Sequence, residues 1–237
     1  MRCEPVLPSV TTRADERGAA LALLPIAATL DYYALPVDIQ AETIVQFIPQ
    51  LISYLALALW IVHNGAILSR IGLEPANLPL GLKIGFFTGL ALGSVNTLIL
   101  LRIFPHLGYD IAFLKDTPHG QLPVFVMVPW FIVGIAVFVE VNFRGFLLGR
   151  LISIEANSWR LSSIRRFSPV ALLTSSLVFT FDPFMVNTFH HLHWIALWDG
   201  LIWGLIRLRT GNLYATITAH AVEVVVMYSA VRFALTP

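Results

Sequence analysis

The feature that most constrains this chain is a series of long stretches with almost no ionisable residues. In the stretch 122–143, for example, Glu140 is the only ionisable side chain. A helix needs about 20 mostly apolar residues to cross the roughly 30 Å hydrocarbon core of a bilayer. Membrane β-strands instead alternate apolar and polar residues over about ten positions. The continuous stretches therefore predict an all-α polytopic membrane protein.

The composition supports the same class of protein. Hydrophobic residues make up 57% of the 237 residues and charged residues 12%, and the mean hydropathy is +0.77. Soluble domains are about one quarter charged, and a fold of this size exposes too many side chains to hide so much apolar surface. The single cysteine excludes an internal disulfide. A net charge of +1 without a run of like charges argues against a nucleic-acid partner.

Seven stretches satisfy the length criterion or come close to it. They cover residues 18–35, 45–68, 80–104, 122–143 with a helical continuation to 151, 168–185, 193–208 and 213–235. The sixth stretch is short, so it is also compatible with a re-entrant or tilted segment. We therefore predict about seven transmembrane or re-entrant helices. They form a single membrane domain over residues 18–237, which follows a cytoplasmic tail at 1–17.

The distribution of basic residues predicts the orientation. With the N-terminal tail in the cytoplasm, only Arg102, Lys115 and Arg232 of the 15 Lys and Arg residues lie on the outer side. The positive-inside rule then favours an N-in, C-out topology. The tail mixes acidic and basic residues and does not resemble a cleaved signal peptide. The basic segment 152–167 is expected to anchor the chain at an anionic inner leaflet. We expect a multi-pass integral protein of the cytoplasmic (inner) membrane.

Ionisable residues inside the stretches are the candidates for function, because each costs at least about 2.5–3.5 kcal/mol in the bilayer core. Glu140 and Arg144 are four residues apart, so they share one face of the fourth helix and can form an ion pair. His220 and Glu223 share a face of the last helix, and His220 lies roughly 10 Å from its inner end. Two interpretations stay open. The Glu–Arg pair only anchors the helix end, or Glu140 and His220 meet in a polar cavity.

Two further groups of ionisable residues have several possible roles. Asp199 lies in the middle of the short sixth stretch and needs a partner such as His220, Arg207 or a histidine of the preceding loop. The histidines of that loop are His190, His191 and His193. Imidazoles at such close spacing suit zinc or copper. We favour instead an interfacial belt in which they lie beside Trp194 and Trp198.

Three segments resemble the motifs of one protein family. The run Glu140-Val-Asn-Phe-Arg144-Gly-Phe-Leu resembles the first motif, Glu-Glu-x-x-x-Arg, of the CPBP family of intramembrane proteases, which includes the CAAX prenyl endopeptidases. The segment 174–179 resembles the start of the second-motif helix, and 209–220 resembles the run into the third motif. The resemblance covers about residues 125–230. It implies an endopeptidase that cleaves a membrane-associated peptide or protein, with water activated by a Glu and a His and no cofactor required.

The resemblance assigns the catalytic roles to three residues that match the motifs. They are Glu140, Arg144 and His220. Three other polar positions of the family are replaced by apolar residues. Val139 stands where the first motif has its first Glu, Pro183 where the second motif has His, and Val224 where the third motif has Asn or Asp.

Other ionisable residues are candidates for the missing roles. His193 substitutes for the second-motif His only if its loop folds inward. Asp199 or Glu223 substitutes for the Asn only in the protonated form, because an anion repels an oxyanion. Whether a divalent metal takes part stays open.

The replaced positions leave other functions open. One is a catalytically degenerate relative that binds a membrane protein or peptide as a scaffold or complex subunit. Another is an ion-coupled carrier in which Glu140, Asp199 and Glu223 relay protons, although such carriers are typically built from internal repeats, and the chain shows none. For the peptidase and for the scaffold or complex subunit, the expected partners are the lipid bilayer and a membrane-anchored peptide or protein.

Overall fold

The computed structural model describes residues 16–159 and 168–235. Within these ranges the regular elements are all helices, so the predicted all-α fold is confirmed. Most of the predicted tail and the basic half of the segment 152–167 lie outside the described residues. Nothing in the structure therefore bears on the roles predicted for them.

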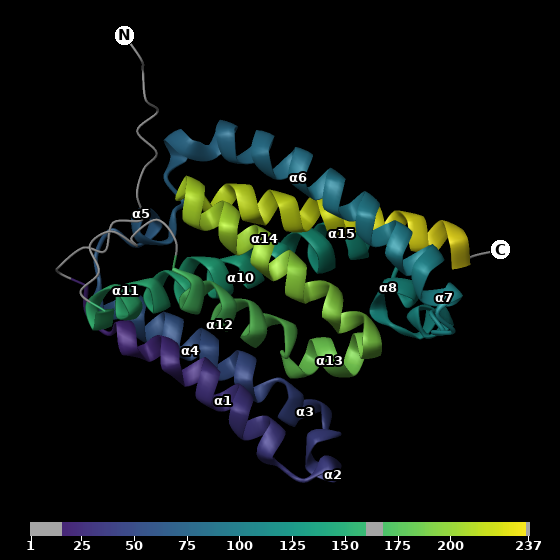
Figure 1. Ribbon diagram of the computed structural model, residues 1–237, viewed down its shortest axis with the longest axis horizontal. Helices are drawn as coiled ribbons and strands as arrows, with labels where there is room; N and C mark the ends of the chain where they lie inside the picture. Colours follow the sequence, from purple (N-terminus) through teal and green to yellow (C-terminus); the bar gives the residue numbers. More distant parts are fainter. Residues whose placement is uncertain (1–15, 160–167, 236–237) are drawn as a thin grey trace.

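The main helices pack into one bundle (Figure 1). They are α1 (Leu23–Ala34), α4 (Ile48–His63), α6 (Leu78–Leu98), α10 (Ile135–Glu140), α11 (Leu148–Trp159), α12 (Pro169–Thr180), α14 (Ile195–Thr210) and α15 (Leu213–Leu235). Two π-helical segments, η5 (Met127–Gly134) and η6 (Val141–Leu147), continue α10 at both ends. The short elements used below are α5 (Ile67–Ile71), α8 (Pro118–Gln121), α13 (Pro183–Phe189) and η7 (His190–Trp194).

Several of these helices are long and apolar enough to cross a bilayer. Four candidate spans meet the criterion: Thr43–His63, Ile67–His106, Val124–Ala156 and Leu213–Leu235. The pair Pro169–Thr180 and Pro183–Thr210, bent by 50° at the break between its members, gives a fifth if it counts as one span. The helix Ala19–Ala34 is apolar but shorter. The protein is thus a polytopic membrane protein, and the exact count of seven stays a prediction.

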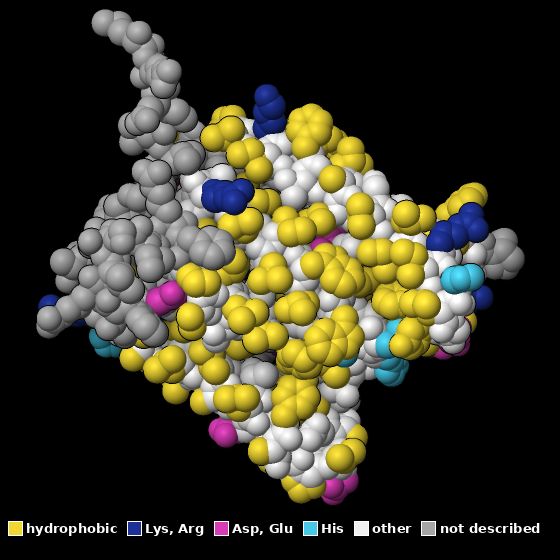
Figure 2. Space-filling view, in the orientation of Figure 1, with side chains coloured by type: hydrophobic (Ala, Val, Ile, Leu, Met, Phe, Trp, Pro, Cys, Tyr) yellow, Lys and Arg dark blue, Asp and Glu magenta, His cyan; other side chains and the backbone are white. Residues whose placement is uncertain are grey.

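The surface has the character of a membrane protein. Figure 2 shows hydrophobic side chains over the middle of one face, with most charged side chains and histidines near its margins. Large apolar side chains that face outward include Phe87, Phe125, Trp130 and Phe138, which are 62–77% exposed. Acyl chains are the natural surroundings for such a surface.

The closest helix pair, α6 and α15, depends on a row of glycines. Figure 1 shows the two helices side by side. Glycines recur at every fourth position of α6, at 81, 85, 89 and 93, and all four are buried. A Cβ atom on Gly89 would lie 2.4 Å from the carbonyl oxygen of Ala219. Small residues at this spacing let two membrane helices approach closely, and here they set the position of α15 beside α6.

The fifth predicted stretch, 168–185, is interrupted. Helix α12 ends at Thr180, and α13 begins at Pro183. Asp182 caps α13, because its Oδ1 accepts hydrogen bonds from the backbone N–H groups of Phe184 (3.1 Å) and Met185 (3.3 Å). Gln50 of α4 donates to the same oxygen over 2.8 Å. This buried carboxylate therefore has a structural explanation.

Candidate functional site

Glu140, Arg144 and His220 meet inside the bundle. Nη1 of Arg144 lies 3.1 Å from Oε1 of Glu140, and Nδ1 of His220 lies 3.1 Å from the same oxygen. The side chains of Glu140 and Arg144 are 0% and 1% exposed, and that of His220 is 12% exposed. Since an ionised carboxylate only accepts hydrogen bonds, Nδ1 of His220 is the donor. The structure thus brings together the three residues to which the motifs assign catalytic roles.

The local backbone explains how Glu140 and Arg144 are presented. Glu140 is the last residue of α10, and Arg144 lies in the π-helical segment η6. Such wider turns are rare and occur frequently at functional sites. Cζ of Arg144 lies 4.2 Å from the ring centroid of Phe179 and 5.0 Å from that of Trp203. Cation–π interactions with these rings stabilise the guanidinium group, which is buried away from water.

His220 is held by a ring contact as well as by the carboxylate. Its imidazole stacks on the indole of Trp203, with ring centroids 4.4 Å apart and planes inclined by 19°. Among the described residues, no side chain or backbone group hydrogen-bonds to Nε2. The ring is therefore fixed in one orientation, with Nδ1 towards Glu140 and Nε2 free to bind another group.

Several buried polar atoms close to this group lack a hydrogen-bond partner in the described part of the chain. They are Oε2 of Glu140, Nη2 of Arg144, Oγ of Ser176 and Nε1 of Trp203. Two of these side chains converge on Gly200, where an added Cβ would lie 3.2 Å from Cβ of Ser176 and 3.3 Å from Nη2 of Arg144. An unsatisfied buried polar group costs about 1–3 kcal/mol. The site therefore has unused donors and acceptors that a polar ligand can satisfy once it is admitted.

Glu140 and His220 meet, as one of the two interpretations predicts, but the side chain of Glu140 is fully buried in the described structure. Access from outside ends at the edge of His220, which is slightly exposed. Any chemistry with water at this site thus requires the bundle to open locally.

A second polar cluster involves Asp199 and Glu223. Nδ2 of Asn96 lies 3.1 Å and 3.3 Å from the two carboxylate oxygens of Asp199 and 2.6 Å from Oε1 of Glu223. The partners proposed for Asp199 from the sequence, His220, Arg207 and a loop histidine, do not form these contacts. Asn96 itself was missed, although an amide in the middle of an apolar stretch is a signal that it is paired with another polar group.

The loop histidines lie apart from Glu140 in a layer of aromatic rings. His193 lies 5.8 Å from Phe181 and 5.0 Å from Trp194 between ring centroids, and its Nδ1 contacts the backbone oxygen of His190. Over residues 16–159 and 168–235, no group of three or more His, Cys, Asp or Glu side chains is placed to hold a metal ion.

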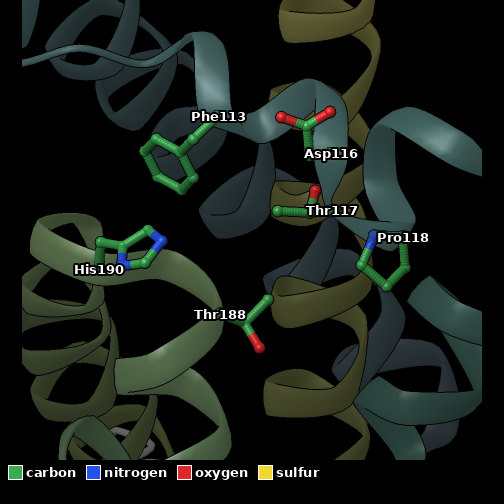
Figure 3. Close-up of a pocket in the computed structure, with 6 residues that line it drawn as sticks. All are labelled: Phe113, Asp116, Thr117, Pro118, Thr188 and His190. Carbon is green, nitrogen blue, oxygen red and sulfur yellow. The ribbon is translucent and has the colours of Figure 1, made fainter.

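A cavity of about 380 Å³ lies beside His190 (Figure 3). Its lining combines Phe113, Asp116, Thr117 and Pro118 with Thr188 and His190. In the figure, the imidazole of His190 lies close to the ring of Phe113, and their centroids are 4.8 Å apart. Neither Glu140 nor His220 lines this cavity, so it is separate from the candidate site.

The family comparison covers the whole of the candidate site apart from Asn96. Residues 121–226 match the family model described as type II CAAX prenyl endopeptidase Rce1-like. This segment is thus similar to the type II CAAX prenyl endopeptidases. The resemblance inferred from the motifs is thereby confirmed. The comparisons with curated proteins and with solved structures gave no match.

Within the CAAX prenyl endopeptidase segment, the three substituted positions have packing roles. Val139 packs against the main hydrophobic core. Pro183 is the first residue of α13. Val224 packs in the cluster formed by Met127, Ile132 and Tyr228. The described structure therefore shows apolar packing where the family has polar groups. The apolar helices and the family match together indicate an integral membrane protein that is similar to the CAAX prenyl endopeptidases over residues 121–226.

Proposed function

We propose that the protein is an intramembrane peptidase in which His220 is the general base and Glu140 orients it. The observation that carries this proposal is the 3.1 Å contact between Nδ1 of His220 and Oε1 of Glu140. A carboxylate that accepts from Nδ1–H fixes the imidazole tautomer and leaves the lone pair of Nε2 available for a proton. Nε2 has no other partner among the described residues, so it is the atom to which water would bind.

This assignment differs from the one that the family motif implies for Glu140. Oε1 of Glu140 already faces Arg144 and His220, and the side chain is fully buried. A carboxylate engaged by two cationic or donor groups is a poor acceptor for a third proton. The first-motif Glu is replaced by Val139, and the free nitrogen of His220 supplies a base in its place.

The proposed reaction is hydrolysis of a peptide bond. Nε2 of His220 takes a proton from water while the water oxygen attacks the scissile carbonyl carbon. The C–N bond then breaks, and the proton passes from the imidazolium to the leaving amine. The unused donors Nη2 of Arg144 and Nε1 of Trp203 are candidates to stabilise the oxyanion, and the indole face stacked on His220 favours the transient imidazolium.

The substrate class follows from the surroundings of the site. His220 lies seven residues from the start of α15, roughly 10 Å along a helix axis. A scissile bond must therefore enter the membrane region, which suits a membrane-anchored peptide or protein. We place the protein in the cytoplasmic (inner) membrane, with no cofactor required for this route.

The test is cleavage of membrane-anchored peptides by the purified full-length chain in proteoliposomes. We expect His220→Ala to abolish cleavage and Glu140→Gln to reduce it about 10²- to 10⁴-fold, as expected for a general base and its orienting group. His63→Gln, which changes an exposed histidine of α4, is the matched control. Full activity of His220→Ala would exclude the proposed base.

A second candidate function is a non-catalytic binding subunit. The observation in its favour is the complete burial of the Glu140–Arg144 ion pair, because such a pair also serves to join helices. Under this proposal, Glu140→Gln lowers the thermal stability of the protein, while the unaltered chain cleaves no membrane peptide and instead co-purifies with a membrane protein partner.

A further inference from the structure

Two acidic residues outside the proposed catalytic pair lie together in the bundle. Asp199 of α14 and Glu223 of α15 are 4% and 1% exposed, and both carboxyl groups accept hydrogen bonds from the same atom, Nδ2 of Asn96. The two acids are therefore neighbours in a site that excludes water. Two negative charges in such a site repel each other strongly. A proton on one of the two groups removes this repulsion.

The amide of Asn96 determines which kind of ligand the carboxyl pair accepts. Nε1 of Trp198 donates to Oδ1 of Asn96 over 2.9 Å. Since the indole N–H only donates, the amide cannot be turned around, and Nδ2 must face the carboxyl groups. It donates to Asp199 and, over 2.6 Å, to Glu223. A donor in this position disfavours a metal cation, which needs acceptors around it, and is compatible with a proton shared by the two acids.

The remaining groups that face the pair set its charge. Arg144, on η6, interacts electrostatically with both acids, and Glu140 adds a negative charge that acts on Glu223. His220 lies one turn before Glu223 on α15 and contacts Glu140. With both acids ionised, three carboxylates would share the guanidinium of Arg144. With one proton on the pair, two carboxylates remain ionised beside one guanidinium. A charged His220 would balance the second of these carboxylates.

The second oxygen of Glu223 also favours a proton on the pair. Oε2 of Glu223 is buried and has no hydrogen-bond partner in the described ranges. A bare carboxylate oxygen in that position carries a full desolvation cost, whereas the oxygen of a neutral carboxyl group is much cheaper to bury.

We propose that Asn96, Asp199 and Glu223 form a buried proton-binding site that holds one proton between the two acids at neutral pH. The proposal does not rest on the proposed peptidase activity, since the site is built from groups that the proposed reaction does not use. It lies next to Arg144 and so sets how strongly that guanidinium is held by Glu140. Loss of the proton would add a negative charge that competes with Glu140 for the guanidinium of Arg144.

The first test is infrared spectroscopy of the purified full-length chain in lipid. We expect a carbonyl band from a protonated carboxyl group at neutral pH, which shifts in heavy water and disappears in Glu223→Gln or Asp199→Asn. Glu42→Gln, at an exposed position, should leave the band unchanged. A band that survives in both acid variants, or that is absent from the unaltered chain, would overturn the proposal.

The second test is thermal unfolding against pH in detergent. Because the folded state holds a proton that the unfolded acids have lost, stability should fall as the pH rises from neutral, and the slope should be smaller by one proton in Glu223→Gln. At neutral pH this variant, which mimics the protonated acid, should keep the melting temperature of the unaltered chain, whereas Glu140→Gln should lower it. Equal losses in the two variants, or stability in the unaltered chain that requires sodium ions, would contradict a proton site.

Discussion

The glycine row of α6 offers the most direct test of how the bundle positions its polar groups. Replacing Gly89 with alanine would place a Cβ atom 2.4 Å from the carbonyl oxygen of Ala219, whereas ordinary van der Waals contact begins at 3.4 Å. Backbone atoms cannot turn aside as a flexible side chain can. The two helices must therefore separate by about 1 Å at this point, the difference between 3.4 Å and 2.4 Å.

The magnitude follows from two effects of this separation. Overpacking of a well-packed core costs about 1–3 kcal/mol. The bond between Nδ2 of Asn96 and Oε1 of Glu223, now 2.6 Å, would lengthen to about 3.6 Å, beyond hydrogen-bonding distance. We expect a total loss of about 2–4 kcal/mol, which corresponds to a melting temperature lower by about 4–16 °C for a domain of this size.

The assay is thermal unfolding of the purified chain in detergent, with Gly134→Ala as the matched control. A Cβ atom on Gly134 would lie 3.5 Å from the carbonyl oxygen of Pro129, an ordinary contact. The control should match the unaltered chain or exceed its stability slightly, since alanine favours a helix over glycine by up to about 1 kcal/mol. If Gly89→Ala unfolds at the same temperature as Gly134→Ala, the close contact between α6 and α15 does not hold the bundle together.

Two further predictions concern the ends of the helices. Asp182→Ala should lower stability by about 1 kcal/mol through loss of the α13 cap, whereas Asp182→Asn should retain most of it; thermal unfolding of the two variants gives the comparison. Burial against Phe189 and Tyr228 lowers the pKa of His119 in α8 from 6.5 to about 4. The folded state therefore resists protonation, and stability should fall by about 2–3 kcal/mol as the pH drops from 6.5 to 4. His119→Leu should remove this acid dependence, and the exposed His106→Leu should not.

The apolar stretches predicted most of the helical bundle, because hydrocarbon imposes the same requirement along the whole chain. The seventh stretch matches α15 at both ends, 213 and 235. The fifth predicted stretch runs through Phe181, where the structure has a break between helices α12 and α13. Periodicity and hydropathy do not show such a break. The Asp-Pro pair at 182–183 is the local signal, since the acid caps a helix and proline favours its first turn.

Two kinds of contact in the candidate site were predictable from the sequence: contacts along one helix, and contacts between residues at similar depths on two membrane helices. The pair Glu140–Arg144 follows from a spacing of four residues, and the depth of His220 on its helix suggested that it could meet Glu140. The partner of Asp199 could not be derived in this way. Asn96 is 103 positions away in sequence, and the contact depends on how α6 packs against α14 and α15. Packing between distant segments therefore decided what local patterns left open.

One helix, α15, links the two polar groups of the molecule. His220 and Glu223 lie three residues apart on α15. Arg144 forms an ion pair with Glu140, the partner of His220, and interacts electrostatically with Asp199 and Glu223. A shift of α15 relative to α6 therefore changes both groups together. For this reason, if the glycine row sets the helix position, Gly89→Ala should disturb the infrared carboxyl band as well as the melting temperature. A lower melting temperature with an unchanged band would show that α6 and α15 separate without moving Asn96 away from Glu223, and the two polar groups would then be independent.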